Sequence, residues 1–214
     1  MTRNFLPAFV LLTATAAAQN AVPVVGQYRQ FTAEERWGWF MHSATGPVSL
    51  AGGLVSAGLD TARNSPHEYG PHWEGFGRRY GSRIADRVIV SGIEAGVGSL
   101  WGEDPRYYRV PEKTLGKRVL NAVKMTVITH DRSGQEMPAY ARFIAVPASA
   151  FASNAWLPES RNSNSDALNR VATSFVTRIA ANAFSEFWPD IRRRVFHRRS
   201  AAALATGTDA DAIR

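Results

Sequence analysis

The stretch over residues 73–109 constrains the fold most, because it predicts one long helix followed by a stop. Between residues 88 and 102 the only charged side chain is Glu94, so this half should be buried on all sides. Asp104-Pro105 should end the helix, since the residue before a proline avoids the helical region. We expect a central helix over 72–102. Its first half places apolar residues at spacings of three and four on one face: Trp73, Phe76, Tyr80, Ile84 and Val88.

Small residues recur every four positions along this central helix. Gly77, Gly81 and Ala85 form one run, and Gly92 and Gly96 form another. Each glycine costs a helix roughly 1 kcal/mol relative to alanine, so their number needs a reason. Small residues at this spacing let a second helix approach closely. The pattern predicts that other helices press against this one.

The rest of the chain favours helices over a sheet, because its apolar runs rarely alternate strictly. The absence of cysteine excludes disulfides, thiolate metal sites and cysteine nucleophiles. We expect no cofactor. The fold class predicted is all-α, a single-domain bundle of about six glycine- and alanine-rich helices around the helix over 72–102. The six helices are expected near 32–45, 47–63, 72–102, 115–129, 139–157 and 165–197, the last one bent at Pro189.

The start of the chain resembles a secretory signal peptide over 1–18, with Arg3, a short apolar core and a small-residue cleavage site before Gln19. The alternative is a retained N-terminal anchor helix. Residues 19–31 are expected to be a linker. A capping box, with Thr32 at the N-cap and Glu35 three positions on, should open the helical domain over 32–199. Residues 200–214 are expected to be a disordered tail.

Two runs without charged residues, 37–59 and 143–158, are compatible with helices covered either by protein or by lipid. The first is long enough to cross a bilayer, but Gly46-Pro47 interrupts it. A buried or interface-associated helix pair and a membrane-embedded hairpin are both compatible with it.

The helix over 115–129 is amphipathic. We expect its apolar residues, Leu115, Val119, Leu120, Val123 and Val127, to face inward, and Lys117, Arg118 and Lys124 to face outward.

Residues 191–199 carry five arginines: Arg192, Arg193, Arg194, Arg198 and Arg199. A basic amphipathic end of this kind fits an anionic surface such as anionic lipid or lipopolysaccharide phosphate. Nucleic acid is the least expected partner of these arginines, because an exported protein meets the anions of the envelope first. The alternative is a solvated helix end whose arginines complement the helix dipole.

The candidates for catalysis or ligand binding are Glu94, Glu103, Asp104 and Arg106. The last three belong to the densest polar and aromatic cluster, over 103–109, which could bind a charged ligand or fasten a loop to helix ends. Glu94, alone on an apolar helix, must be paired or neutral. It could pair with Arg142 or Arg178, or act as a general acid with a raised pKa.

Two patterns resemble known sites only superficially. His67, Glu68 and His72 have the wrong spacing for a zinc-binding helix and Gly70-Pro71 between them, so no metal site is predicted. His130, Asp131 and Ser133 are neighbours in sequence, and neighbours seldom assemble a catalytic triad.

Four runs make the chain similar to a set of uncharacterised exported proteins of acidobacteria: GFGRRYGSRIAD over 75–86, EDPRYYR over 103–109, SNAWLP over 153–158 and EFWPDI over 186–191. The resemblance implies an exported, mostly helical protein and no particular activity. We expect a non-enzymatic helical protein of the periplasm or cell envelope, associated with a membrane or self-associating through its helices. The alternative is a periplasmic small-ligand-binding protein or hydrolase with its polar site near Glu94 and the loop over 103–109.

Overall fold

The computed structural model describes residues 28–110 and 114–208, with side chains as far as Arg192. The signal peptide expected over 1–18 and residues 209–214 of the tail lie outside this range. Within it the chain is mainly helical, which confirms the predicted all-α bundle. Its six α-helices are α2 (Ala33–Thr45), α3 (Pro47–Ala62), α4 (Trp73–Trp101), α5 (Leu115–Val127), α6 (Tyr140–Ala152) and α7 (Asn164–Thr208).

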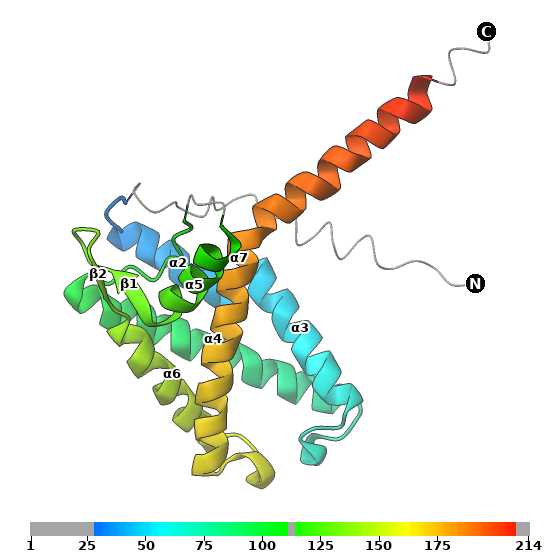
Figure 1. The fold of residues 1–214 in the computed structure, drawn as a ribbon. Helices are drawn as coiled ribbons and strands as arrows, with labels where there is room; N and C mark the ends of the chain where they lie inside the picture. The colour runs from blue at the N-terminus through cyan, green and yellow to red at the C-terminus, as the bar shows by residue number, and fades with distance from the viewer. Residues whose placement is uncertain (1–27, 111–113, 209–214) are drawn as a thin grey trace.

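Helix α4 is the centre of the bundle, as the sequence predicts. Helices α2, α3 and α6 all pack against it, while α5 and α6 pack against α7 (Figure 1). Helix α7 changes direction where it leaves the other helices. Pro189 lies inside it, and the helix runs on to Thr208. The boundary expected at residue 199 between helical domain and tail therefore falls within α7.

The ends of the helices follow local sequence signals. Thr32 and Glu35 form the predicted capping box of α2, and Pro47 occupies the first turn of α3. Helix α4 ends earlier than Asp104-Pro105 would require. Gly102 adopts a left-handed conformation with φ of 77°, and Glu103 N donates to Gly98 O at 2.8 Å. Glycine tolerates this conformation best, so Gly102 is the stop.

A short antiparallel hairpin, absent from the sequence-based prediction, links α5 to α6. It pairs β1 (Ile128–His130) with β2 (Glu136–Pro138). In the turn, the Asp131 carboxylate accepts hydrogen bonds from Ser133 N at 2.7 Å and Gln135 N at 3.0 Å. Asp104 N donates to His130 O at 2.9 Å, which ties the loop after α4 to the hairpin.

The glycines of α4 act only in part as predicted. A Cβ built on Gly77, Gly81 or Gly96 would meet no atom within 4 Å, so no helix of the described residues presses against those positions. A Cβ on Gly92 would lie 3.6 Å from Phe40 of α2, and one on Gly98 would lie 3.4 Å from the Ala141 Cβ of α6. The spacing showed that small residues share a face, but it could not show which of them a neighbouring helix reaches.

Candidate functional site

Glu94 is buried in α4 and lies in an ion-pair cluster with two arginines. Arg178 of α7 donates to Glu94 Oε1, and Arg142 Nε of α6 lies 3.7 Å from the same oxygen. Both pairings considered from the sequence are therefore present. Arg142 Nη1 also donates to Met125 O at 3.0 Å and Thr126 O at 2.8 Å, near the end of α5. One carboxylate thus joins α4, α6 and α7.

The charges of this cluster favour a structural role for Glu94. Burial lowers the pKa of Arg142 to about 10; Arg178 adds to this shift and Glu94 opposes it. Arg142 therefore remains a cation at neutral pH, and Glu94 lies against the guanidinium groups of both Arg142 and Arg178. A general acid instead needs an apolar site without a cation beside it.

The carboxylates of the loop over 103–109 also have hydrogen-bond donors within the protein. Asp104 is fully buried and accepts hydrogen bonds from Arg106 Nη2 at 2.6 Å and from the Tyr108 hydroxyl at 2.7 Å. Glu103 accepts from Trp101 Nε1 at 2.8 Å and from Ala141 N at 2.9 Å. The second contact places a negative charge at the first turn of α6, where it complements the helix dipole. The hydrogen bonds of Asp104 and Glu103 therefore hold the loop over 103–109 in its conformation.

A further buried carboxylate, Glu186 of α7, holds the same loop to α7. It accepts from the Tyr107 hydroxyl at 2.7 Å and from Arg118 Nε at 3.1 Å. Arg118 Nη1 also lies 2.6 Å from Asp190 Oδ2, so α5 and α7 are joined through one guanidinium. Sequence reasoning assigned Glu186 no role. The signal that singles out Glu94, a lone carboxylate among apolar helical residues, also applies to it.

The structure separates the sequence-predicted candidates. Glu103, Asp104 and Arg106 belong to the loop, whereas Glu94 belongs to the cluster between α4, α6 and α7. His130 lies against Tyr108, with ring centroids 4.7 Å apart, while Ser133 Oγ donates to Asp131 at 2.6 Å as part of the turn. Within the described ranges, no three His, Asp or Glu side chains gather in a way that could hold a metal ion.

His130 makes a testable contribution to stability. Burial lowers its pKa; Glu136 and Asp104 oppose the shift. The unfolded chain therefore binds a proton at higher pH than the folded chain does, so the free energy of unfolding should fall as pH falls below about 6.5. A His130→Gln variant should lose this part of the slope. Urea unfolding followed by circular dichroism at several pH values measures it; an unchanged slope in the variant would contradict the assignment.

The outward-facing apolar residues form the most unusual feature of the molecule. On α5, Leu115 and Leu120 are each 66% exposed, and the buried residues are Asn121, Ala122, Met125 and Thr126. The prediction that the apolar stripe of this helix faces inward is therefore wrong. We call the following set the outer apolar surface: Leu115, Val119, Leu120, Val123 and Val127 of α5; Phe143, Ile144 and Phe151 of α6; and Leu168, Val176 and Phe184 of α7.

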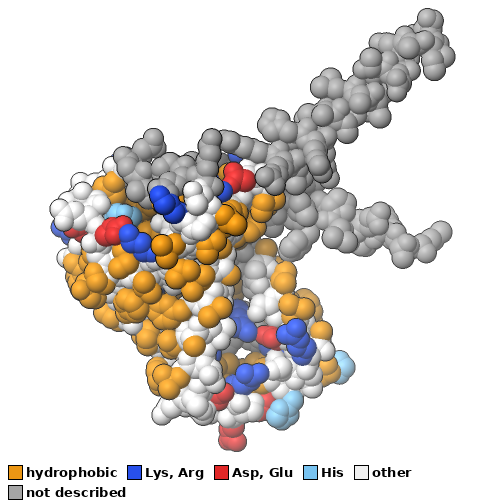
Figure 2. All heavy atoms as spheres, viewed as in Figure 1, with side chains coloured by type: hydrophobic (Ala, Val, Ile, Leu, Met, Phe, Trp, Pro, Cys, Tyr) orange, Lys and Arg blue, Asp and Glu red, His pale blue; other side chains and the backbone are white. Residues whose placement is uncertain are grey.

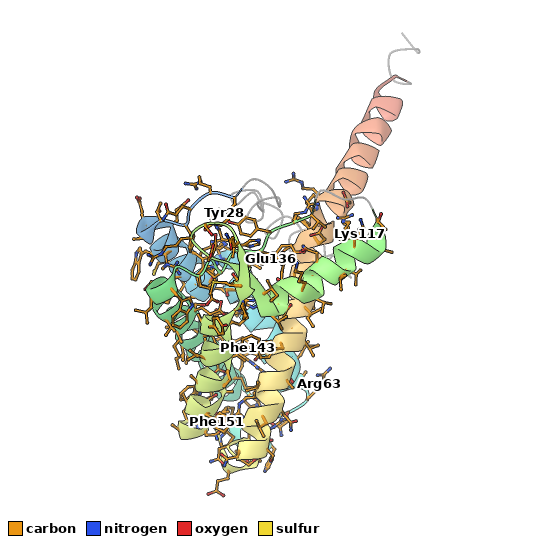
Figure 3. The ribbon with its side chains drawn as sticks, turned by 60° about the vertical axis from the view of Figure 1, so that its left-hand side comes forward. Tyr28, Arg63, Lys117, Glu136, Phe143 and Phe151 are labelled. Atoms are coloured by element: carbon orange, nitrogen blue, oxygen red, sulfur yellow. The ribbon has the colours of Figure 1, made fainter. Side chains whose placement is uncertain are left out.

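Two helices of the outer apolar surface, α5 and α6, both pack against the third, α7. In Figure 2 hydrophobic side chains gather over the region of α5, α6 and the hairpin. Figure 3 shows α5 crossing α7 with Lys117 near its outer end, and Phe143 and Phe151 along α6. Exposed apolar patches this extensive are rare on soluble monomers and mark surfaces that contact something else.

The interior is correspondingly polar. Among the described side chains, the buried apolar ones are mostly alanines, joined by Tyr108, Met125 and Val146. Large apolar residues usually fill a soluble core, and charged ones are seldom fully buried. Small and hydrogen-bonded polar residues between helices, with apolar residues outside, are typical of helices packed in lipid. The buried polar and charged set is Arg79, Ser91, Glu94, Glu103, Asp104, Asn121, Thr126, Thr129, His130, Arg142, Ser149, Ser153, Asn182 and Glu186.

Of the arginines expected to bind an anionic surface, Arg192 is exposed at the surface of α7. The side chains of Arg193, Arg194, Arg198 and Arg199 lie outside the described part of the structure. In the residues described, no helix combines the length and the apolar character that crossing a membrane requires.

Comparison with protein-family models, with curated proteins and with solved structures gives no match to this chain.

Proposed function

We propose that this chain is an exported, non-enzymatic helical protein of the cell envelope that binds a membrane through its outer apolar surface. The observation that carries the proposal is the inverted polarity of the bundle, with buried carboxylates and arginines inside and leucine, valine and phenylalanine outside. The sequence pattern over 1–18 supports export.

The dimensions of α5 support attachment along the membrane interface. Its 13 residues make a helix of about 20 Å, shorter than the roughly 30 Å hydrocarbon core. An amphipathic helix of this kind lies in the plane of the interface with its apolar face in the acyl region. Fully burying one leucine or valine side chain contributes about 1.5–3 kcal/mol, so the five apolar residues of α5 provide a substantial gross driving force.

The arginines at 192–199, which lie inside α7, would strengthen such an attachment. Helix α5 packs against α7, and Arg118 joins it to Glu186 and Asp190, a few residues before the arginines at 192–199. A basic side chain near an anionic lipid surface contributes about 1 kcal/mol. The partner we propose is therefore anionic lipid, or the phosphate groups of lipopolysaccharide.

A periplasmic ligand-binding protein or hydrolase acting through Glu94 and the loop over 103–109 is less well supported. Glu94 and Glu103 already have donors from other helices, and Asp104 has Arg106 and Tyr108 of its own loop. Binding a charged ligand there would first require breaking these contacts, which are buried and therefore costly to break.

A double variant, Leu120→Gln with Val123→Gln, tests the proposed surface. Both side chains are exposed, so the fold should be retained. Binding to anionic phospholipid vesicles in a flotation assay should fall at least about tenfold, because the loss of two apolar insertions exceeds about 1.4 kcal/mol.

The matched control makes the same change on α3, at Leu54 and Leu59, which are also exposed but lie outside the outer apolar surface. Leu54→Gln with Leu59→Gln should leave vesicle binding within about twofold of the unmodified chain. Equal losses in both double variants would show that vesicle binding follows overall hydrophobicity rather than this surface.

A further inference from the structure

A groove of about 760 Å³ lies between the N-terminal part of α2 and the C-terminal half of α4, and none of its lining residues belongs to the outer apolar surface. Its size is in the range of sites that hold one small molecule, roughly 300–1,000 Å³. One wall is aromatic and comes from Phe31, Trp37 and Phe40. The other wall consists of small residues on one face of α4: Gly92, Ala95, Gly96 and Ser99.

The small residues of α4 give this groove its space. A Cβ on Gly96 would meet nothing within 4 Å, and one on Gly92 would lie 3.6 Å from Phe40 Cε2. No helix of the described bundle fills the space above Gly96. The glycines at 92 and 96, which the sequence marks as a close-packing face, thus border an open apolar groove.

The charged residues that line the groove are both arginines, Arg36 and Arg132. Arg36 Nη2 donates to Glu103 O at 2.8 Å, and Arg132 Nη2 donates to Ser99 O at 3.0 Å. Both partners are neutral carbonyl oxygens; within the described residues neither guanidinium forms an ion pair with a carboxylate. Arg36 Nη1 is shielded from solvent and has no hydrogen-bond partner there. The walls of the groove are therefore mainly apolar, and the charged side chains that line it are cations.

We propose that this groove binds a single-chain amphiphile with an anionic head, of the long-chain carboxylate class. The aliphatic chain would lie between Trp37 and Phe40 on one side and Gly92 and Gly96 on the other. The carboxylate would meet Arg132, which is exposed, with the positive charge of Arg36 adding to the attraction. An anion bound by a guanidinium forms stronger hydrogen bonds than the neutral carbonyls do. The site differs from the outer apolar surface in residues and in ligand.

Photo-crosslinking tests the site with the full chain in zwitterionic lipid nanodiscs. The probe is dodecanoic acid carrying a diazirine on its chain, and peptide mass spectrometry locates the label. We expect label over residues 30–40 and 92–99. An amine of the same chain length with the same diazirine should label these peptides at least about tenfold less, because it presents a cation to the two arginines.

Gly96→Leu should reduce the label at these peptides at least about tenfold by filling the groove, and without strain, since its Cβ meets open space. Gly77→Leu is the matched control, on the same helix and equally open, and should label like the unmodified chain. Arg132→Gln should reduce labelling while the chain retains its helical content.

Three results would each overturn the proposal. Label spread over α5, α6 and α7 and unchanged by Gly96→Leu would mean partition into lipid only. Equal labelling by the amine would remove the role of the arginines. No label over 30–40 and 92–99 would mean that the groove does not take this ligand, as when another part of the chain or a second copy fills it.

Discussion

A Glu94→Ala variant should lose about 3–5 kcal/mol of folding free energy, the cost of removing one partner from a buried ion pair. The substitution leaves Arg142 nine-tenths or more buried, with Arg178 nearby and no anion between them. Domains are commonly stable by only 5–15 kcal/mol, so this is a large part of the total. Urea unfolding followed by circular dichroism measures the loss.

The matched control is Glu74→Ala on the same helix. Glu74 pairs with Arg78 at 2.7 Å, one turn away and exposed, and such pairs contribute only about 0.2–0.5 kcal/mol. If Glu94→Ala does not fold, adding Arg178→Met should restore part of its stability by removing one of the two cations. A Glu94→Ala loss no larger than that of Glu74→Ala would refute the structural role of Glu94.

An Asp104→Asn variant should lose about 3 kcal/mol, because it removes the charge that Arg106 and the Tyr108 hydroxyl contact in a fully buried position. The volume hardly changes, so the effect isolates the charge and its hydrogen bonds. The loop over 103–109 should loosen first, and hydrogen exchange of its amides should increase more than that of α3.

Asp60→Asn provides the comparison for this second change. Asp60 lies 2.8 Å from Arg83, and both side chains are partly exposed, so the expected loss is between zero and about 1 kcal/mol. Equal effects of the two substitutions would indicate that the loop does not depend on its buried carboxylate.

The sequence was informative wherever a local rule determines the outcome. Thr32 and Glu35 reach each other within one helical turn, and Pro47 is preorganised for the first turn of a helix, so α2 and α3 begin where expected. Glu94 is the only charged residue between 88 and 102, so it was expected to be paired, and Arg178 forms that pair. The three-residue strands of the hairpin are too short to give a recognisable alternation, so they were missed.

The sequence could not determine which face of a helix is covered. The periodicity of α5 separates Leu120 and Val123 from Asn121 and Thr126, but the same periodicity fits an apolar face turned either way. Burial depends on the neighbouring helices, and here the residues that meet them are polar. Likewise Gly96 and Gly98 are indistinguishable by type, yet one borders a groove and the other meets α6.

The central claim is that lipid covers the outer apolar surface. The chain contains no cysteine, so a single Val123→Cys substitution can carry a nitroxide spin label on α5, and Gly77→Cys, exposed on α4, provides the reference. With the full chain bound to anionic vesicles, the label at 123 should relax readily with oxygen, which concentrates in lipid, and little with a water-soluble nickel chelate. The label at 77 should show the opposite order. Equal exposure of both labels to the nickel chelate would contradict the claim.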